Sequence, residues 1–151
     1  MKRPTSHGFT LVELLIVITV IAILAALTLN VAGYINDKAA RERARTEIES
    51  IGAALASYKA EHGDYPFSAS PQTNSGSTDQ TLYTNLSPLT GKVYFEFPKG
   101  MTNANKAIID PFGNGYGYQY PGATNRSGTN FYDLFSTANK GTDSNAWIKN
   151  W

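Results

Sequence analysis

The chain has 151 residues, a formal net charge of +1 at pH 7 and no cysteine. This length is enough for one ordinary domain, and the lack of cysteine excludes a disulfide framework, a thiolate metal site and a cysteine nucleophile. The near-neutral charge gives no indication of nucleic acid as a primary ligand.

A long apolar run follows a short basic start. Residues 1–8, MKRPTSHG, are polar, whereas the run from Phe9 to Leu29 carries Glu13 as its only charge. As a helix, this run would be about 31 Å long, close to the hydrocarbon thickness of a bilayer. It therefore predicts a single membrane-spanning helix, since it is too long for the core of an ordinary signal peptide. A secretion signal cleaved near Ala32–Gly33 and an uncleaved anchor are the alternatives.

Residues 36–62 continue the helical pattern with a changed composition. Apolar residues recur there at steps of three and four, which is typical of one buried face of an amphipathic helix. Gly63 and Pro66 indicate where the helix ends. We expect one bent or continuous helix over residues 9–62, with a break near Asn30–Gly33 as the alternative because both residues weaken a helix. The predicted buried face consists of Ala44, Ile48, Ile51, Leu55 and Tyr58.

The remainder of the chain, residues 64–151, is rich in glycine and proline and predicts a small antiparallel sheet. A polar surface loop is expected over residues 68–79. Because a sheet of about three strands is not stable alone, we expect the apolar face of the long helix to cover it in an α+β fold. Segments rich in aromatic or β-branched residues predict strands at Lys92–Phe97, Gly115–Tyr120 and Phe131–Phe135.

The segment GFTLVELLIVITVIAILAAL, preceded by a basic start, resembles the N-terminus of type IV pilins and of the pseudopilins of type II secretion. The resemblance implies a pilin-like fold, cleavage between Gly8 and Phe9 by prepilin peptidase, and N-methylation of Phe9. It also implies an inner-membrane protein with a cytoplasmic N-terminus and a periplasmic C-terminal domain. The expected segments are a leader (1–8), a transmembrane and filament-core helix (9–30), the soluble half of the same helix (31–63) and a globular β-rich domain (64–151).

Glu13 is the residue that this arrangement predicts to act in assembly. A carboxylate within an apolar run is costly unless it is paired, and cleavage before Phe9 creates a positive amine nearby. Pairing of Glu13 with the Phe9 amine of a neighbouring subunit would select the register of a helical bundle. The alternative is a monomeric anchor in which Glu13 is protonated or reaches the membrane surface.

The charges that follow the apolar run do not favour the expected orientation. The positive-inside rule places basic residues in the cytoplasm, and the basic residues after the run outnumber Lys2 and Arg3 before it. The expectation of a cytoplasmic N-terminus therefore rests on the resemblance. The residues concerned are Lys38, Arg41, Arg43 and Arg45.

Two C-terminal segments, DPFGNGYGYQYPG (Asp110–Gly122) and FYDLFSTANKG (Phe131–Gly141), resemble the major pseudopilin, or G subunit, of type II secretion. The resemblance implies a structural filament subunit and not an enzyme. Its implied partners are further copies of itself, minor pseudopilins, prepilin peptidase and an inner-membrane assembly platform. A subunit of a type IV surface pilus, which serves adhesion, motility or DNA uptake, is the alternative.

Relatives of this branch bind calcium in the loop after the YDLFS motif, but here Lys140 occupies the position of an acidic ligand. An ammonium group cannot ligate calcium, which takes six to eight oxygen ligands. We therefore expect no metal and no cofactor. The oxygen donors of an alternative calcium site are Asn139, Asp143 and Asn145.

Overall fold

The computed structural model describes most of the chain, namely residues 8–68, 80–124 and 126–151. The side chains of residues 28–32 are also outside the described part. The predicted loop at residues 68–79 lies almost wholly outside the described residues, and so does most of the predicted leader. The chain forms two compact units, residues 1–38 and residues 39–151.

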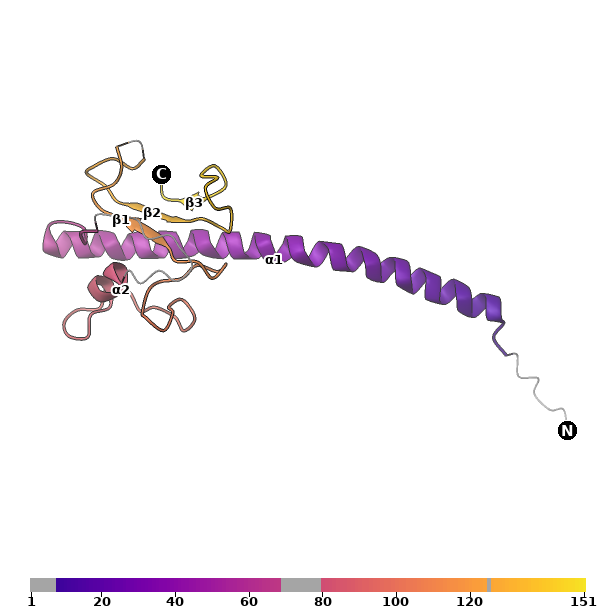
Figure 1. Ribbon diagram of the computed structural model, residues 1–151. Coiled ribbons are helices and arrows are strands. Elements are labelled where there is room, and N and C mark those ends of the chain that lie inside the picture. The colour runs from indigo at the N-terminus through magenta and orange to yellow at the C-terminus, as the bar shows by residue number, and fades with distance from the viewer. Residues whose placement is uncertain (1–7, 69–79, 125) are drawn as a thin grey trace. The chain divides into compact units, whose positions relative to one another are not determined.

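One long helix, α1, spans Leu11–His62 (Figure 1). Its backbone has no break near Asn30–Gly33, the alternative that the sequence left open. Gly63 ends the helix: its φ is +85°, and its N–H donates to the Lys59 carbonyl at 2.8 Å. A glycine in the left-handed conformation is a common helix stop because it has no Cβ to clash.

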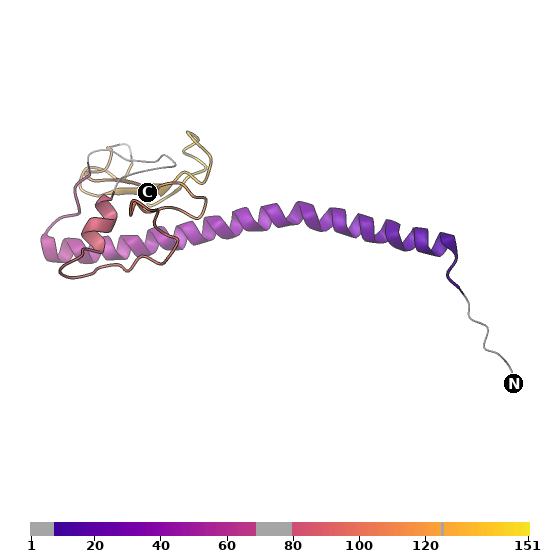
Figure 2. The same cartoon turned by 60° about the horizontal axis from the view of Figure 1, so that its bottom comes forward.

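A three-stranded antiparallel sheet lies in the second unit, in the order β1-β2-β3. The strands are β1 (Gly117–Gln119), β2 (Asp133–Ser136) and β3 (Ile148–Lys149), and Tyr118 lies opposite Leu134 in the pairing of β1 with β2. Figure 1 and Figure 2 show this sheet beside the second-unit part of α1. The predicted α+β, pilin-like fold of a long helix packed on a small sheet is confirmed.

The predicted strand at Lys92–Phe97 is wrong. Two backbone N–H groups of this segment donate to the Leu86 carbonyl, at 2.8 and 3.0 Å, at the end of a short helix, α2 (Thr81–Leu86). Its Phe97 ring stacks on Tyr83 of α2, with the ring centroids 5.4 Å apart. The aromatic residues that suggested a strand therefore pack against a helix, and the third strand of the sheet is β3.

The core of the second unit is formed jointly by α1, α2 and the sheet. Both views place α2 beside the C-terminal end of α1. Leu82 and Leu86 of α2 are buried in the same cluster as Ile51 of α1 and Leu134 of β2. The small sheet is thus covered by helix, as its size requires.

Candidate functional site

The predicted processing site lies directly before α1. Gly8, Phe9 and Thr10 precede the first helical residue, Leu11, and the Phe9 side chain is 84% exposed. A Cβ added at Gly8 would meet nothing within 4 Å. The peptide bond between Gly8 and Phe9 therefore lies in an accessible segment outside the helix.

Glu13 forms a capping box with Thr10 at the start of α1. The Glu13 carboxylate accepts hydrogen bonds from the Thr10 N–H and from the Thr10 hydroxyl, both at 2.8 Å. In return, the Glu13 N–H donates to the Thr10 hydroxyl oxygen at 3.2 Å. This exchange satisfies backbone N–H groups that have no partner within the first turn of a helix. The sequence carries the signal of this capping box, a threonine three residues before a glutamate.

The first unit exposes apolar side chains on every side of α1. All the described side chains from Phe9 to Leu27 are exposed, including those of Leu14, Ile18 and Leu24. A helix that is apolar all round is normally buried in a protein core or in a membrane, and apolar patches of this extent normally mark an interaction surface. This segment therefore needs a partner, either lipid or other helices.

Among the described residues, which leave out the side chains of residues 28–32, no helix is both long and apolar enough to cross a membrane. The single-pass topology stays a prediction.

The predicted buried face of α1 lies in the core of the second unit. Ile48, Ile51 and Leu55 are buried in the main hydrophobic cluster, while Tyr58 is partly buried and packs against it. The Tyr58 ring stacks on His62, with centroids 4.1 Å apart, and its hydroxyl donates to an asparagine of α2 at 3.2 Å. The last turn of α1 is thus attached to α2 by polar as well as apolar contacts.

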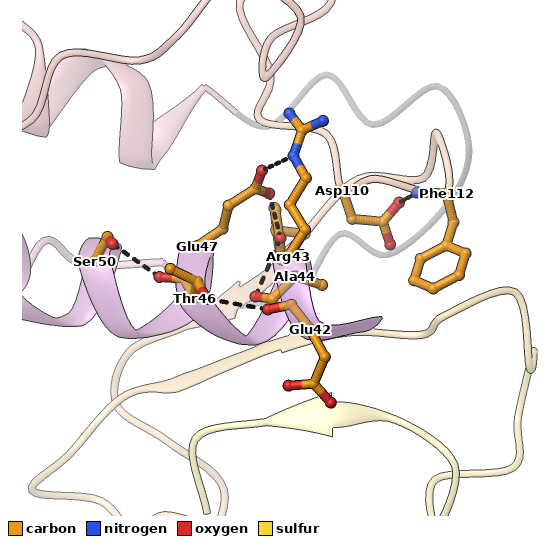
Figure 3. Close-up of polar contacts among 9 residues, drawn as sticks. Glu42, Arg43, Ala44, Thr46, Glu47, Ser50, Asp110 and Phe112 are labelled. Atoms are coloured by element: carbon orange, nitrogen blue, oxygen red, sulfur yellow. Dashed lines mark hydrogen bonds and ion pairs between the residues drawn. The ribbon is translucent and has the colours of Figure 1, made fainter. Parts of the chain in front are cut away.

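Asp110 organises the turn that the DPFGNG motif predicts. Its carboxylate accepts the backbone N–H of Phe112 at 3.0 Å (Figure 3). The same carboxylate oxygen accepts the Asn114 N–H at 2.8 Å, and the Gly113 N–H donates to the Asp110 carbonyl. The second carboxylate oxygen accepts the Ser136 hydroxyl at 2.5 Å. Burial raises the pKa of Asp110 above its ordinary value, although these hydrogen bonds oppose the shift. Ser136 is thereby engaged in a structural contact.

Glu47 connects α1 to the residue before β1. Its carboxylate accepts the Tyr116 hydroxyl at 2.7 Å and the Arg43 Nε–H at 2.8 Å, and Figure 3 shows the pairing of Arg43 with Glu47. Burial and the bond to Glu47 raise the pKa of Tyr116 far above its ordinary value, so the phenol remains a hydrogen-bond donor. The helix and the sheet are therefore fastened by a specific polar contact beside the apolar core.

The residues of the alternative calcium site do not fit calcium. The Asn139 side-chain oxygen accepts the Asn114 amide at 2.6 Å, and the Asp143 carboxylate accepts the Asn145 N–H at 3.2 Å. Lys140 adds a positive charge to the same loop. Within the described part of the chain, no group of three or more metal-binding His, Asp or Glu side chains is found. With one carboxylate and a neighbouring ammonium, this donor set is not acidic enough for a calcium ion.

These features define a pilin-like subunit: a helix with an exposed apolar first part, and a small sheet packed on its second part. Residues 3–29 match the family described as the prokaryotic N-terminal methylation motif. Residues 30–151 match the family described as type II secretion system (T2SS), protein G. The chain therefore belongs to the type II secretion system protein G family and is a major pseudopilin component of such a system, a structural subunit.

Several curated relatives agree with this assignment. The chain is 32% identical over 158 residues to the type II secretion system core protein G of Pseudomonas aeruginosa, and the match covers 100% of this chain and 99% of that protein. It is 32% identical over 136 residues to the core protein G of Escherichia coli, with 89% and 83% covered. The match to the Vibrio cholerae core protein G has 31% identity over 123 residues, with 81% and 75% covered.

Proposed function

We propose that this subunit is held in the inner membrane by residues 9–30, is cleaved between Gly8 and Phe9, and is then added to a filament whose core is the same helix. The observation that carries this proposal is the first part of α1, which exposes apolar side chains all round and carries one carboxylate, Glu13, near its start. Lipid would cover these side chains before assembly, and neighbouring helices would cover them afterwards.

Glu13 sets the register of the growing filament in this proposal. Cleavage before Phe9 creates a positive amine, and burial of that amine and of the Glu13 carboxylate is tolerated only when each is paired. Both hydrogen bonds from Thr10 go to the same carboxylate oxygen, Oε2. The capping box therefore leaves Oε1 able to accept the amine of a neighbouring subunit, and a wrong offset between helices would leave both charges unpaired.

The proposed topology has a cytoplasmic N-terminus and a periplasmic unit over residues 39–151. The match of residues 3–29 to the N-terminal methylation motif supports this orientation, although the basic residues after the apolar run do not. The partners are further copies of this chain, minor pseudopilins, prepilin peptidase and the inner-membrane assembly platform. Membership in the protein G family supports the self-assembly and the association with other secretion components.

The test separates the charge of Glu13 from its capping role. Glu13→Gln keeps an oxygen that can accept from Thr10 but removes the charge, whereas Glu13→Asp keeps the charge with a shorter reach. Filament yield after overexpression is compared with the amount of mature protein in the membrane. We expect Glu13→Gln to be cleaved normally but to leave mature subunit in the membrane, and Glu13→Asp to be intermediate. A normal filament yield from Glu13→Gln would show that the charge does not set the register.

Intact mass of the membrane-extracted protein checks the processing step. The wild-type chain should begin at N-methylated Phe9, and so should Glu13→Gln, because the scissile bond lies four residues away. Gly8→Leu, which places a bulky side chain at the cleavage site, is the unprocessed control. A wild-type mature chain that still begins at Met1, in a host with prepilin peptidase, would contradict the proposal.

A further inference from the structure

The loop between β2 and β3, residues 137–147, is closed by its own backbone hydrogen bonds. Three consecutive turns place an N–H on the carbonyl three residues earlier: Lys140 on Thr137 at 2.8 Å, Asp143 on Lys140 at 3.1 Å, and Ala146 on Asp143 at 3.1 Å. Each of these turns directs the backbone without help from an outside ligand.

Side-chain donors occupy three further carbonyls of the same loop. Both terminal nitrogens of Arg41, on α1, donate to the Ala146 carbonyl at 3.1 and 3.0 Å. The Lys149 ammonium donates to the Ser144 carbonyl at 3.2 Å. The remaining contact is from the Trp147 indole N–H to the Gly141 carbonyl at 2.9 Å. Two of these three donors, Arg41 and Lys149, are basic side chains.

The Trp147 ring is also held in place by contacts with the sheet and with Arg126. Its ring stacks on Phe135 of β2, with the centroids 4.6 Å apart and the planes 3° from parallel. The Arg126 guanidinium lies 5.8 Å from the Trp147 centroid and 5.4 Å from that of Phe135. The Trp147 side chain, at the end of the loop, therefore packs on the sheet and also holds the Gly141 carbonyl, so it attaches the loop to the sheet.

A calcium ion in this loop would need the oxygens that these donors hold. Calcium takes six to eight oxygen ligands, among them backbone carbonyls, and the negative ends of carbonyl dipoles attract any cation. Here Arg41 and Lys149 bring that positive charge to the Ala146 and Ser144 carbonyls. A calcium ion at these carbonyls would lie beside both cations and would be repelled by them and by Lys140.

We propose that Arg41 and Lys149 are the resident cations of the 137–147 loop, so that the loop of this pseudopilin is ordered without calcium. Arg41 acts as a clamp between α1 and the loop, and Lys149 closes the loop onto the strand that follows it. The calcium dependence that the family resemblance implies is replaced in this chain by hydrogen bonds from side chains.

The first test measures thermal unfolding of the full chain in detergent, by near-ultraviolet circular dichroism of the tryptophans, in millimolar calcium chloride and in excess EGTA. Calcium at a concentration about one hundred times the Kd of a specific site would raise the Tm by on the order of 10 °C in a domain of this size. We expect the two Tm values to coincide, and we expect no saturable terbium luminescence sensitised by Trp147. A Tm rise of that size, or terbium luminescence that calcium abolishes, would overturn the proposal.

The second test compares Arg41→Met with Arg45→Met. Both variants remove a guanidinium from α1, but within the described part of the chain the hydrogen bonds of Arg45 go to the exposed Glu42 on the same helix and not to the loop. We expect Arg41→Met to lower the Tm by on the order of 5 °C more than Arg45→Met, equally with calcium and with EGTA. Lys149→Met should lower it in the same manner. Equal Tm values for Arg41→Met and Arg45→Met would refute the role of Arg41 as a clamp. If calcium restored the Tm of Arg41→Met, the loop would not be independent of the metal.

Discussion

Replacing Leu55 with alanine should destabilise the second unit strongly, because this side chain is completely buried in the core that α1, α2 and the sheet form together. The change removes about three methylene-sized groups, and their transfer from water alone contributes about 2.4 kcal/mol. The cavity left in a packed core adds to this loss, so the total falls at about 2–5 kcal/mol. For a unit of this size, a loss of about 3 kcal/mol lowers the Tm by roughly 10–15 °C.

The assay is thermal unfolding of the full chain in detergent, with Leu89→Ala as the matched control. Leu89 is 90% exposed, so the same chemical change at this position should leave the Tm within about 2 °C of the wild type. Equal Tm values for Leu55→Ala and Leu89→Ala would show that the assigned face of α1 does not form the core. A large loss at Leu55 alone supports the assignment.

Two further predictions concern the sheet and the turn before it. Gly117→Ala should destabilise the unit by about 1–3 kcal/mol, because an added Cβ would lie 2.5 Å from the buried Phe135 ring. In denaturant titrations, the double variant Gly117→Ala/Phe135→Leu should recover part of this lost stability. The raised pKa of Asp110 means that the folded state binds this proton more tightly than the unfolded chain does. Stability from this group is therefore full below the ordinary aspartate pKa and declines as pH rises through the raised value. A plot of Tm against pH for Asp110→Asn should lack that decline, and a profile parallel to wild type would contradict the assignment.

The long helix and two of the three strands could be predicted because their signals are local and periodic. The steps of three and four through Ile48, Ile51 and Leu55 identify a buried face without knowledge of what covers it. The alternation in Gly115–Tyr120 likewise marks β1. By contrast, β3 is the two-residue strand Ile148–Lys149, which is too short to produce any pattern. The pattern of Lys92–Phe97 predicts a strand wrongly for a related reason, since its aromatic residues fit a sheet or the side of a helix equally well.

The polar contacts of the candidate site follow a different rule, since most of them join residues far apart in the sequence. The bond from Tyr116 to Glu47 and the contact of Arg41 with the Ala146 carbonyl depend on how α1 lies against the sheet and its loops. No spacing pattern in the sequence predicts either contact. Sequence reasoning could exclude an acidic ligand at Lys140, but it could not show which groups hold the loop in place of a metal.

The capping box gives the Glu13 carboxylate a role in the folding of the subunit, and the proposed role in assembly would use the same carboxylate. The Thr10 N–H and hydroxyl both bind Oε2, so the start of α1 is stabilised by local contacts that exist in a single chain. An uncharged glutamine retains an oxygen for this purpose. Pairing with the amine of a neighbour, however, requires the negative charge, because two opposite charges attract strongly when water is excluded. The proposed assembly role therefore concerns the charge of Glu13 and the capping role concerns its shape. For this reason Glu13→Gln should leave helix formation and cleavage intact while it prevents growth of the filament.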